Sequence, residues 1–318
     1  ASHCDARSQF ADGNARQPVL PRSLEVAHAS AVTQPDASDT ERLHMMDLQE
    51  RARLELGETQ EVREECLRRL RLLIKEASLH VPSDEKFLLM FLRSKKYNVE
   101  EAFRVFQNYV NARRDVPEFF RDLRPENSRL REICHENHLV MTSTEPDSLG
   151  RSMALMRLGA WNPTMCSFND FVRGVLTLAS CNFYEDLAQI GGVAGIVDLE
   201  GLGFHHFRQL TPGLLIKMTH ITQDCSPVRM KAVYVINYPS AFKTLFEVVK
   251  PFLKHKLLKR VHFVREDLSE LWKVCPQDLV PDEFGGKRND FDFDRQEELV
   301  FRKRHVFEDL CRYDLPPP

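Results

Sequence analysis

Beyond Pro125 the chain alternates short runs of β-branched and other apolar residues with amphipathic helical segments, and few folds accommodate such an alternation. We expect strands at residues 139–142, 153–158, 193–199 and 231–236. A helix is expected at residues 167–184, and Thr211 caps a further helix that has Pro212 at its first position. The alternation predicts an α/β domain with a largely parallel sheet.

Three amphipathic segments precede this domain. Apolar residues recur at helical spacing within residues 62–77, 87–92 and 103–110. Pro82 ends the first helix, and Asn98 followed by Glu101 resembles a capping box at the start of the third. Helices joined by loops this short favour a small all-α bundle, which we place at residues 40–120.

The first 39 residues are rich in Ala, Ser, Arg, Gln and Pro without sustained periodicity, which predicts a disordered tail. Acids balance the arginines of this tail, unlike in an organelle transit peptide, and the pattern of a secretory signal is not visible. No window approaches the roughly 18 consecutive apolar residues of a membrane-spanning helix. The eight cysteines form no CxxC pair, which indicates reduced thiols. We expect a cytoplasmic protein.

Residues 240–260 combine an apolar stripe with a dense run of cations. The stripe has the i, i+3, i+4, i+7 spacing of one helix face and consists of Phe242, Leu245, Phe246, Val249, Phe252 and Leu253. Residues 224–264 hold eight Lys and Arg against two acids, although the net charge of the chain is only −3. The segment is either an ordinary amphipathic helix with a solubilising face or a cover beside a surface that holds phosphates or anionic lipid headgroups. The low net charge gives no indication of nucleic-acid binding.

Five segments make the pattern specific. They are FLLMFLRSKKYNVEEAFRVFQNYVNAR (87–113), GIVDLEGLGF (195–204), QDCSPVRMKAVYVINYPSAF (223–242), VVKPFLKHKLLKRVHF (248–263) and LVPDEFGG (279–286). In this order the chain resembles the CRAL-TRIO lipid-transfer family from about residue 59 to residue 286. The resemblance implies a helical N-terminal domain, a lipid-binding α/β domain at residues 121–287 whose sheet floors a hydrophobic cavity, and a C-terminal extension at 288–318. It implies a carrier of a small tocopherol-, retinoid- or isoprenoid-like lipid that needs no cofactor.

The resemblance also assigns residues by position. The cavity falls on Val172, Val175, Leu176, Ala179, Val193, Val197, Leu202, Met218, Ile221 and Val233. The lid falls on the apolar stripe of residues 242–253. A cleft that binds phosphoinositide falls on five cations, which are Lys95, Arg229, Lys231, Lys256 and Arg260. Docking of that anionic headgroup at a membrane is expected to favour opening of the lid.

Several positions depart from the tocopherol-binding members of the family. Val175 and Ala179 stand where those members have serines, and Leu202 stands where they have Trp. A hydroxyl on the cargo would therefore find fewer side-chain partners in this cavity. The departures leave open which lipid the cavity takes.

Other functions have weaker support. Cys134, His135 and His138 form a CHxxH cluster, but no second ligand group completes a tetrahedral metal site, so we expect no metal. Asp198 and Glu200 resemble paired carboxylates, yet their DLEG context favours a turn at a strand end. With no P-loop and no GxSxG motif, we expect no catalytic residues and no enzyme. The alternative function is a phosphoinositide-sensing scaffold that uses the acidic stretch at residues 290–298.

Overall fold

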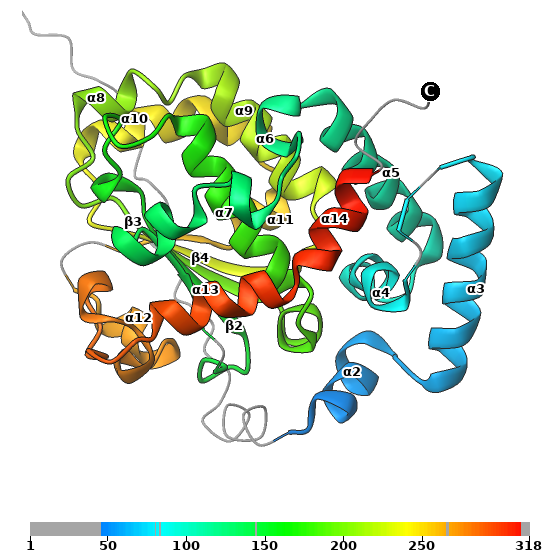
Figure 1. Cartoon of the computed structure of the whole chain (residues 1–318). Coiled ribbons are helices and arrows are strands. Elements are labelled where there is room, and N and C mark those ends of the chain that lie inside the picture. The colour runs from blue at the N-terminus through cyan, green and yellow to red at the C-terminus, as the bar shows by residue number, and fades with distance from the viewer. Residues whose placement is uncertain (1–45, 80, 83, 144, 265–266, 313–318) are drawn as a thin grey trace, which may run out of the picture. The chain divides into compact units, whose positions relative to one another are not determined.

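The computed structural model describes residues 46–312, apart from residues 80, 83, 144, 265 and 266 (Figure 1). These residues lie within one compact unit, residues 35–318. The predicted disordered tail at residues 1–39 falls outside the described residues. In the described part, the helices are too short or too polar to cross a membrane.

Five helices lie at the start of the described chain. They are α2 (Leu48–Leu56), α3 (Gln60–Glu76), α4 (Glu85–Ser94), α5 (Val99–Asp115) and α6 (Pro117–Phe120). Thr59 caps α3, Asp84 caps α4, and the Asn98 side chain accepts the Glu101 amide as predicted. Phe87, Phe91 and Phe106 meet edge to face at 5.0–6.2 Å between ring centroids and form the centre of this helical core.

A five-stranded sheet follows, in the order β1-β2-β3-β4-β5. Its strands are β1 (Val140–Thr142), β2 (Ser152–Arg157), β3 (Val193–Asp198), β4 (Met230–Ile236) and β5 (Val261–Phe263). β1 pairs with β2 antiparallel, and each later pair is parallel. The predicted α/β class with a largely parallel sheet is confirmed. The three-residue β5 was not predicted because it is too short to show alternation.

The connections between parallel strands contain α7 (Phe168–Phe183), then α8 (Phe204–Phe207) and α9 (Pro212–His220), then α10 (Ser240–Val249) and α11 (His255–Leu258). Ser167 caps α7, and Thr211 caps α9 with Pro212 in its first turn, as predicted. Because the strand order follows the chain and such crossovers are right-handed, all three connections belong on the same face of the sheet. Apolar residues of α7, α9 and α10 share one hydrophobic cluster, in agreement with this topology.

The C-terminal part of the chain covers the other face. α12 (Ser269–Val274) packs there through Leu271 and Val274. α13 (Phe293–Arg302) and α14 (Arg304–Arg312) then return, with Val300 and Phe307 joining the cluster of α7 and Leu310 joining the helical core of α2–α5 (Figure 1). Shorter 3-10 and π turns complete the fold, and they are η1 (Pro125–Asn127), η2 (Arg131–Glu136), η3 (Leu158–Ala160), η4 (Leu187–Gly191), η5 (Ile221–Cys225), η6 (Lys250–Phe252), η7 (Gln277–Leu279) and η8 (Asp282–Phe284).

Candidate functional site

The two faces of the sheet are packed differently. We call the side toward α12 the closed face, where each side chain is at most 2% exposed: Met153, Leu155, Ala194, Ile196, Ala232, Tyr234 and Ile236. We call the side toward α7 the open face. Val235 is buried there, but these side chains keep partial exposure: Ala154, Met156, Val197, Val233, Val261 and Phe263. Strand register aligns Ala154 with Val233 and Val261, and Met156 with Val197 and Phe263. The open face is thus a continuous apolar surface across β2–β5.

The helices above the open face are loosely packed. α9 contains no buried residue, and α10 buries only Val249, although both sequences are apolar. Leu214, Leu215 and Met218 of α9 are partly exposed and pack against the same cluster as Phe242 and Leu245 of α10. Interiors are normally close-packed, so these helices are packed less tightly than the core of the domain.

Eight of the ten predicted cavity residues meet in this cluster, and they are Val172, Val175, Leu176, Val197, Leu202, Met218, Ile221 and Val233. Val172, Leu202 and Ile221 are buried within it. The other two, Ala179 and Val193, are not members of the described cluster, and Val193 is 1% exposed. Their assignment to a cavity wall stays a prediction.

The predicted lid helix is shorter than its apolar stripe. α10 ends at Val249 and continues only as the 3-10 turn η6, because Pro251 has no amide to extend the α-helical hydrogen bonds. The prediction of one helix face running to Leu253 is therefore wrong, and Phe252 is 49% exposed. Phe242 and Phe246 instead contact the ring of Phe263 on the open face, at centroid distances of 6.4 and 4.9 Å.

Three of the predicted cleft cations gather where β4 and β5 begin. Arg229 and Lys231 flank the first residue of β4, and Arg260 directly precedes β5. Burial lowers the pKa of Arg260, and the charge of Arg229 lowers it further, which indicates that the two cations are neighbours. The Arg260 guanidinium donates to the carbonyl of Met230.

A carboxylate that the sequence did not predict lies among these cations. Glu55 Oε2 is 3.0 Å from both Arg229 Nη2 and Lys231 Nζ, and Arg51 Nε is 2.7 Å from Glu55 Oε1. Burial alone would raise the pKa of Glu55, but Lys231 and Arg51 outweigh it and hold the pKa at about 2. We call Arg51, Arg229, Lys231, Arg260 and Glu55 the cationic cluster. Only the i, i+4 spacing of Arg51 and Glu55 was visible in sequence, and it does not indicate a partner on β4.

The other two predicted cations form a second group. Burial lowers the pKa of Lys95, and the charges of Lys254 and Lys256 lower it further. Lys254, which the predicted set omits, also pairs with Asp224. The five predicted positions thus divide into Arg229, Lys231 and Arg260 on one side and Lys95 and Lys256 on the other.

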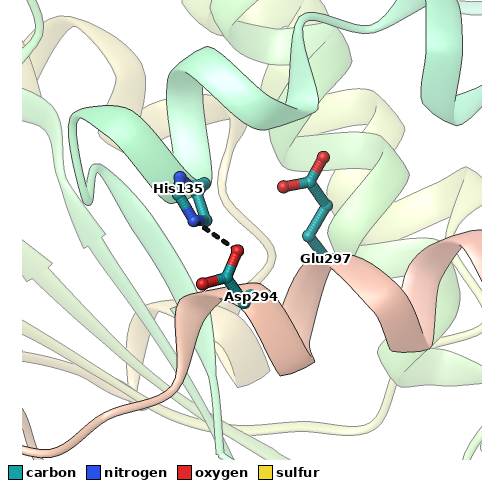
Figure 2. A group of neighbouring side chains, drawn as sticks. All are labelled: His135, Asp294 and Glu297. Carbon is teal, nitrogen blue, oxygen red and sulfur yellow. Dashed lines mark hydrogen bonds and ion pairs between the residues drawn. The ribbon is translucent and has the colours of Figure 1, made fainter.

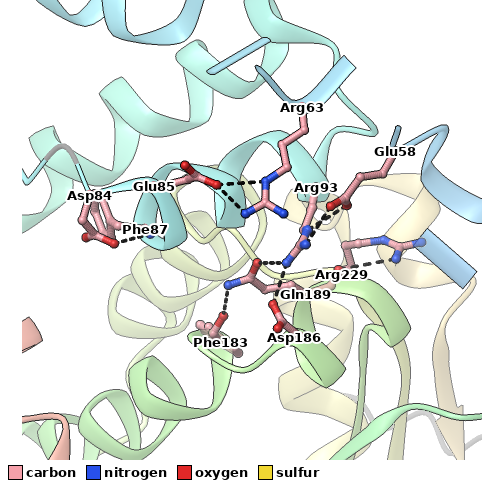
Figure 3. A network of polar contacts seen from close by, with 10 residues as sticks. All are labelled: Glu58, Arg63, Asp84, Glu85, Phe87, Arg93, Phe183, Asp186, Gln189 and Arg229. Atoms are coloured by element: carbon pink, nitrogen blue, oxygen red, sulfur yellow. Dashed lines mark hydrogen bonds and ion pairs between the residues drawn. The ribbon is translucent and has the colours of Figure 1, made fainter. Parts of the chain in front are cut away.

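A buried polar network continues from the cationic cluster into the helical part (Figure 3). Arg93 is 5% exposed and contacts Glu58 at 2.7 Å, Asp186 at 2.7 Å and Gln189 Oε1 at 2.8 Å. The Gln189 carbonyl in turn accepts from Arg229. Glu55 and Glu58 flank Gly57, whose φ of +71° closes α2 in the left-handed conformation. The residues on either side of this turn therefore pair with two different arginines, Glu55 with Arg229 and Glu58 with Arg93.

The CHxxH residues do not converge on one point. Cys134 is buried, and burial raises the pKa of its thiol. His138 stacks on Phe293 and lies 2.8 Å from Glu283. His135 instead approaches Asp294 and Glu297 of α13 (Figure 2), with Nε2 2.7 Å from Asp294 Oδ1.

Arg131 argues against a metal site at His135, Asp294 and Glu297. The three candidate ligand atoms lie within 4.8 Å of one another, but Arg131 Nη1 is already 3.0 Å from Glu297 Oε2 and supplies the positive charge. Both contacts join η2 to α13, so we interpret their role as holding the C-terminal helices against η2.

Two further sequence candidates have structural roles. Asp198 Oδ1 accepts the Glu200 amide and the Asn237 side chain, both at 2.9 Å, which is the strand-end turn that the sequence favoured. His206 is 1% exposed, with Nε2 2.6 Å from the Trp161 carbonyl and Nδ1 accepting the Gly203 amide. Because Nδ1 accepts a hydrogen bond it carries no proton, and burial lowers the pKa of the ring, so we interpret this imidazole as a structural group.

A cavity of about 580 Å³ lies elsewhere, between β1, α7 and α13. Its lining includes Arg288 and Lys303, which pair with Glu145 and Glu185. Asn182 also faces it, and that side chain accepts a hydrogen bond from Ser152. Charged walls of this kind suit an apolar cargo less well than the open face does.

Comparisons with known proteins agree with this fold. The family model named CRAL/TRIO domain matches residues 136–286. "Alpha-tocopherol transfer protein-like" of Mus musculus is 31% identical over 249 residues, which cover 77% of this chain and 71% of that protein. "Clavesin-1" of Xenopus laevis is 28% identical over 245 residues, covering 76% and 74%. A crystal structure of Sfh5 superposes with a TM-score of 0.51 over 87% of this chain and all of that one, at 13% identity, and shows likeness of fold alone.

An α/β domain with one open apolar sheet face and a helical N-terminal part is the architecture of a protein that holds a hydrophobic ligand. The chain belongs to the CRAL-TRIO lipid-transfer family.

Proposed function

We propose that this protein binds one small hydrophobic lipid between the open face and helices α7, α9 and α10, and transfers it to membranes that contain phosphoinositides. The observation that carries the proposal is the contrast within one sheet: the seven closed-face side chains named above are at most 2% exposed, whereas six open-face side chains stay partly exposed beneath apolar helices. Filling that space with lipid would remove apolar surface from water at about 25 cal/mol per Å².

The chemistry of the wall favours an apolar cargo. The predicted cavity residues are all aliphatic or Met, and those of α9 and α10 that face the cluster are also apolar. A tocopherol-, retinoid- or isoprenoid-like lipid has the matching chemistry, and the name of the Mus musculus relative refers to tocopherol transfer. Because Val175 and Ala179 offer no hydroxyl, a cargo with few polar groups is favoured.

The cations provide the proposed membrane contact. Lys256 is exposed next to Lys254, and both precede β5 together with Arg260. Each exposed cation contributes about 1 kcal/mol at an anionic membrane surface. The exposed Phe252 lies on the same segment, so this edge combines charge with an apolar side chain that can enter the interface.

Helix α10 is the proposed lid. It connects β4 to the cationic segment of α11, so headgroup binding at Lys256 acts on the chain that directly follows the lid. Headgroup binding opens the lid only if the open state binds the headgroup more tightly than the closed state does.

Mass spectrometry of lipid extracted from the purified protein tests the first half of the proposal. We expect one hydrophobic lipid near one molecule per chain, which competition with tocopherol, retinaldehyde and phosphatidylinositol then classifies. Absence of stoichiometric lipid would contradict a carrier and favour the alternative function, a phosphoinositide-sensing scaffold.

A transfer assay tests the second half. Lys256→Glu should slow transfer to vesicles containing phosphatidylinositol bisphosphate about tenfold while cargo affinity stays within twofold. Lys287→Glu reverses an exposed charge in the C-terminal segment and serves as the matched control. Equal transfer by both variants would remove phosphoinositide docking from the proposal.

A further inference from the structure

Glu55 holds the position that a phosphate oxygen of a bound headgroup would need. Its Oε2 atom is shared by Arg229 Nη2 and Lys231 Nζ at 3.0 Å each, and Arg51 fixes the other oxygen at 2.7 Å. A carboxylate oxygen and a phosphate oxygen accept hydrogen bonds from the same donors at the same distances. The chain therefore carries its own anion in the cationic cluster.

The location of Glu55 allows that anion to leave. Its side chain is 24% exposed and that of Lys231 is 28% exposed, whereas the side chain of Arg229 is only 8% exposed. Glu55 can thus rotate into water without unpacking Ala52 and Leu56, the residues through which α2 joins the helical core. The nine residues of α2 are also fewer than a helix needs to be stable alone, so its position depends on such tertiary contacts.

Charge decides what can replace the carboxylate. Three cations contact Glu55, and the fourth cation of the cluster, Arg260, donates to a backbone carbonyl. A headgroup with one net negative charge would exchange one ion pair for a similar one and gain little. A bisphosphorylated inositol brings several charges and additional acceptor oxygens, so it gains contacts that Glu55 cannot make.

We propose that Glu55 is a specificity-determining residue of the cationic cluster, an internal competitor that lowers the affinity for every anionic headgroup so that only multiply phosphorylated ones bind. This inference rests on the proposed function. It assigns a role to α2, which lies outside the predicted cleft, and it treats Arg51 as the residue that positions the competitor.

Vesicle sedimentation with Glu55→Gln tests the inference. Vesicles containing phosphatidylserine, an inositol monophosphate lipid or a bisphosphate lipid are compared in parallel. Because one competitor is removed in each case, we expect the variant to bind all three about tenfold more tightly, which brings the first two into the measurable range. A titration with soluble inositol bisphosphate should show the same gain, since the gain belongs to the site and not to the membrane surface.

Glu50→Gln is the matched control. It removes the same charge from the same helix, at an exposed residue that pairs with Arg53. We expect its affinities to equal those of the wild type. A similar gain in both variants would show a general effect of net charge and would overturn the inference.

Three other outcomes of Glu55→Gln would also overturn it. Unchanged or weaker vesicle binding would show that Glu55 only orders the cations. A gain in affinity that grows steeply with the charge of the headgroup would show that Glu55 stays in place when a headgroup binds. If wild type binds bisphosphate vesicles and Lys256→Glu does not, such results reject the competitor but leave the proposed function standing. If neither wild type nor Glu55→Gln binds any anionic vesicle, the inference about Glu55 and the proposed phosphoinositide docking are both rejected.

Hydrogen exchange on the wild-type chain gives a second readout that does not depend on the variant folding. Displacement of Glu55 breaks the ion pairs between α2 and β4, so soluble inositol bisphosphate should speed exchange in residues 48–56 several-fold. Slower or unchanged exchange in this segment at saturating ligand would overturn the inference.

Discussion

The two faces of the same five-stranded sheet have similar apolar composition and opposite packing. On β3, Ile196 points to the closed face and is 1% exposed, while its neighbour Val197 points to the open face and remains partly exposed. Different helices cover the two faces. The closed face packs against Leu271 and Val274 of α12, whereas the open face lies beneath α9 and α10. Hydrophobic composition therefore does not decide which surface becomes core and which stays available to a ligand.

Topology explains the difference. The sequential strand order places every parallel crossover on the open side, so long connections compete to cover it. α9 and α10 do so while burying only Val249 of their own residues. The closed side is left to the C-terminal segment, which fits it fully. Four predictions test this contrast.

The largest effect is expected from truncation on β3. Ile196→Ala should lower the free energy of unfolding by about 4 kcal/mol, because it opens a hole in a closely packed face. Val197→Ala, one residue along, should cost only about 1 kcal/mol since its side chain is already partly exposed. Chemical denaturation measures both values. Equal losses would remove the distinction between the faces.

Low pH should weaken the ion pairs of the cationic cluster, but it should not change the packing of either face of the sheet. The pKa of Glu55 is about 2 in the folded chain against an ordinary value of 4.5, so its contribution is complete above about pH 4.5 and is lost as pH falls toward 2. The contribution amounts to at most about 3 kcal/mol for a partly exposed carboxylate.

The measurement is the difference in unfolding free energy between wild type and Glu55→Gln as a function of pH. It should shrink over that window, while the penalty of Ile196→Ala should not change. A Glu55→Gln difference independent of pH would contradict the assignment of the low pKa to this residue.

Enlargement of two alanines probes free space directly. Ala194→Leu on the closed face should cost about 2 kcal/mol through overpacking. Ala154→Leu on the open face should cost less than about 1 kcal/mol but reduce the amount of lipid that co-purifies. Thermal unfolding and lipid mass spectrometry report the two effects. A large stability loss with unchanged lipid content for Ala154→Leu would place the cargo elsewhere.

The smallest stability effect is expected at the exposed end of the lid segment. Phe252→Ser should change the unfolding free energy by less than about 0.5 kcal/mol, because half of the side chain is already in solvent. Its association with anionic vesicles should fall about threefold, since an interfacial aromatic contact is lost. Phe246→Ser is the contrasting variant, because Phe246 contacts Phe263 and its loss should lower stability instead.

Much of the fold was predictable because its signals are local. The strands predicted at 139–142, 153–158, 193–199 and 231–236 match β1 to β4 within one residue at each end, and the predicted caps at Asn98 and Thr211 are present. The missed elements lack such signals: α2 has four charged residues among nine, and β5 has three residues.

The site was predictable only in part, for a different reason. The resemblance placed most cavity residues in one cluster, but it assigned the lid to a stripe that Pro251 interrupts. Spacing along the chain did not indicate that Glu55 would meet Arg229, 174 residues later, or that Lys254 would lie close enough to Lys95 to lower its pKa. Long-range electrostatic contacts depend on how the helical part packs against the sheet.

The sequence by itself determined the α/β class, the parallel sheet, the helical N-terminal segments and the family, because periodicity, capping and family motifs are properties of short stretches. Only the tertiary structure decided which sheet face closes, where α10 stops covering the other, and which acid neutralises the cationic cluster. These features result from competition among segments far apart in the chain for the same surface. The outcome depends on which segments fill the available volume and on the free-energy cost of burying an unpaired charge. Neither quantity is a property of any single segment.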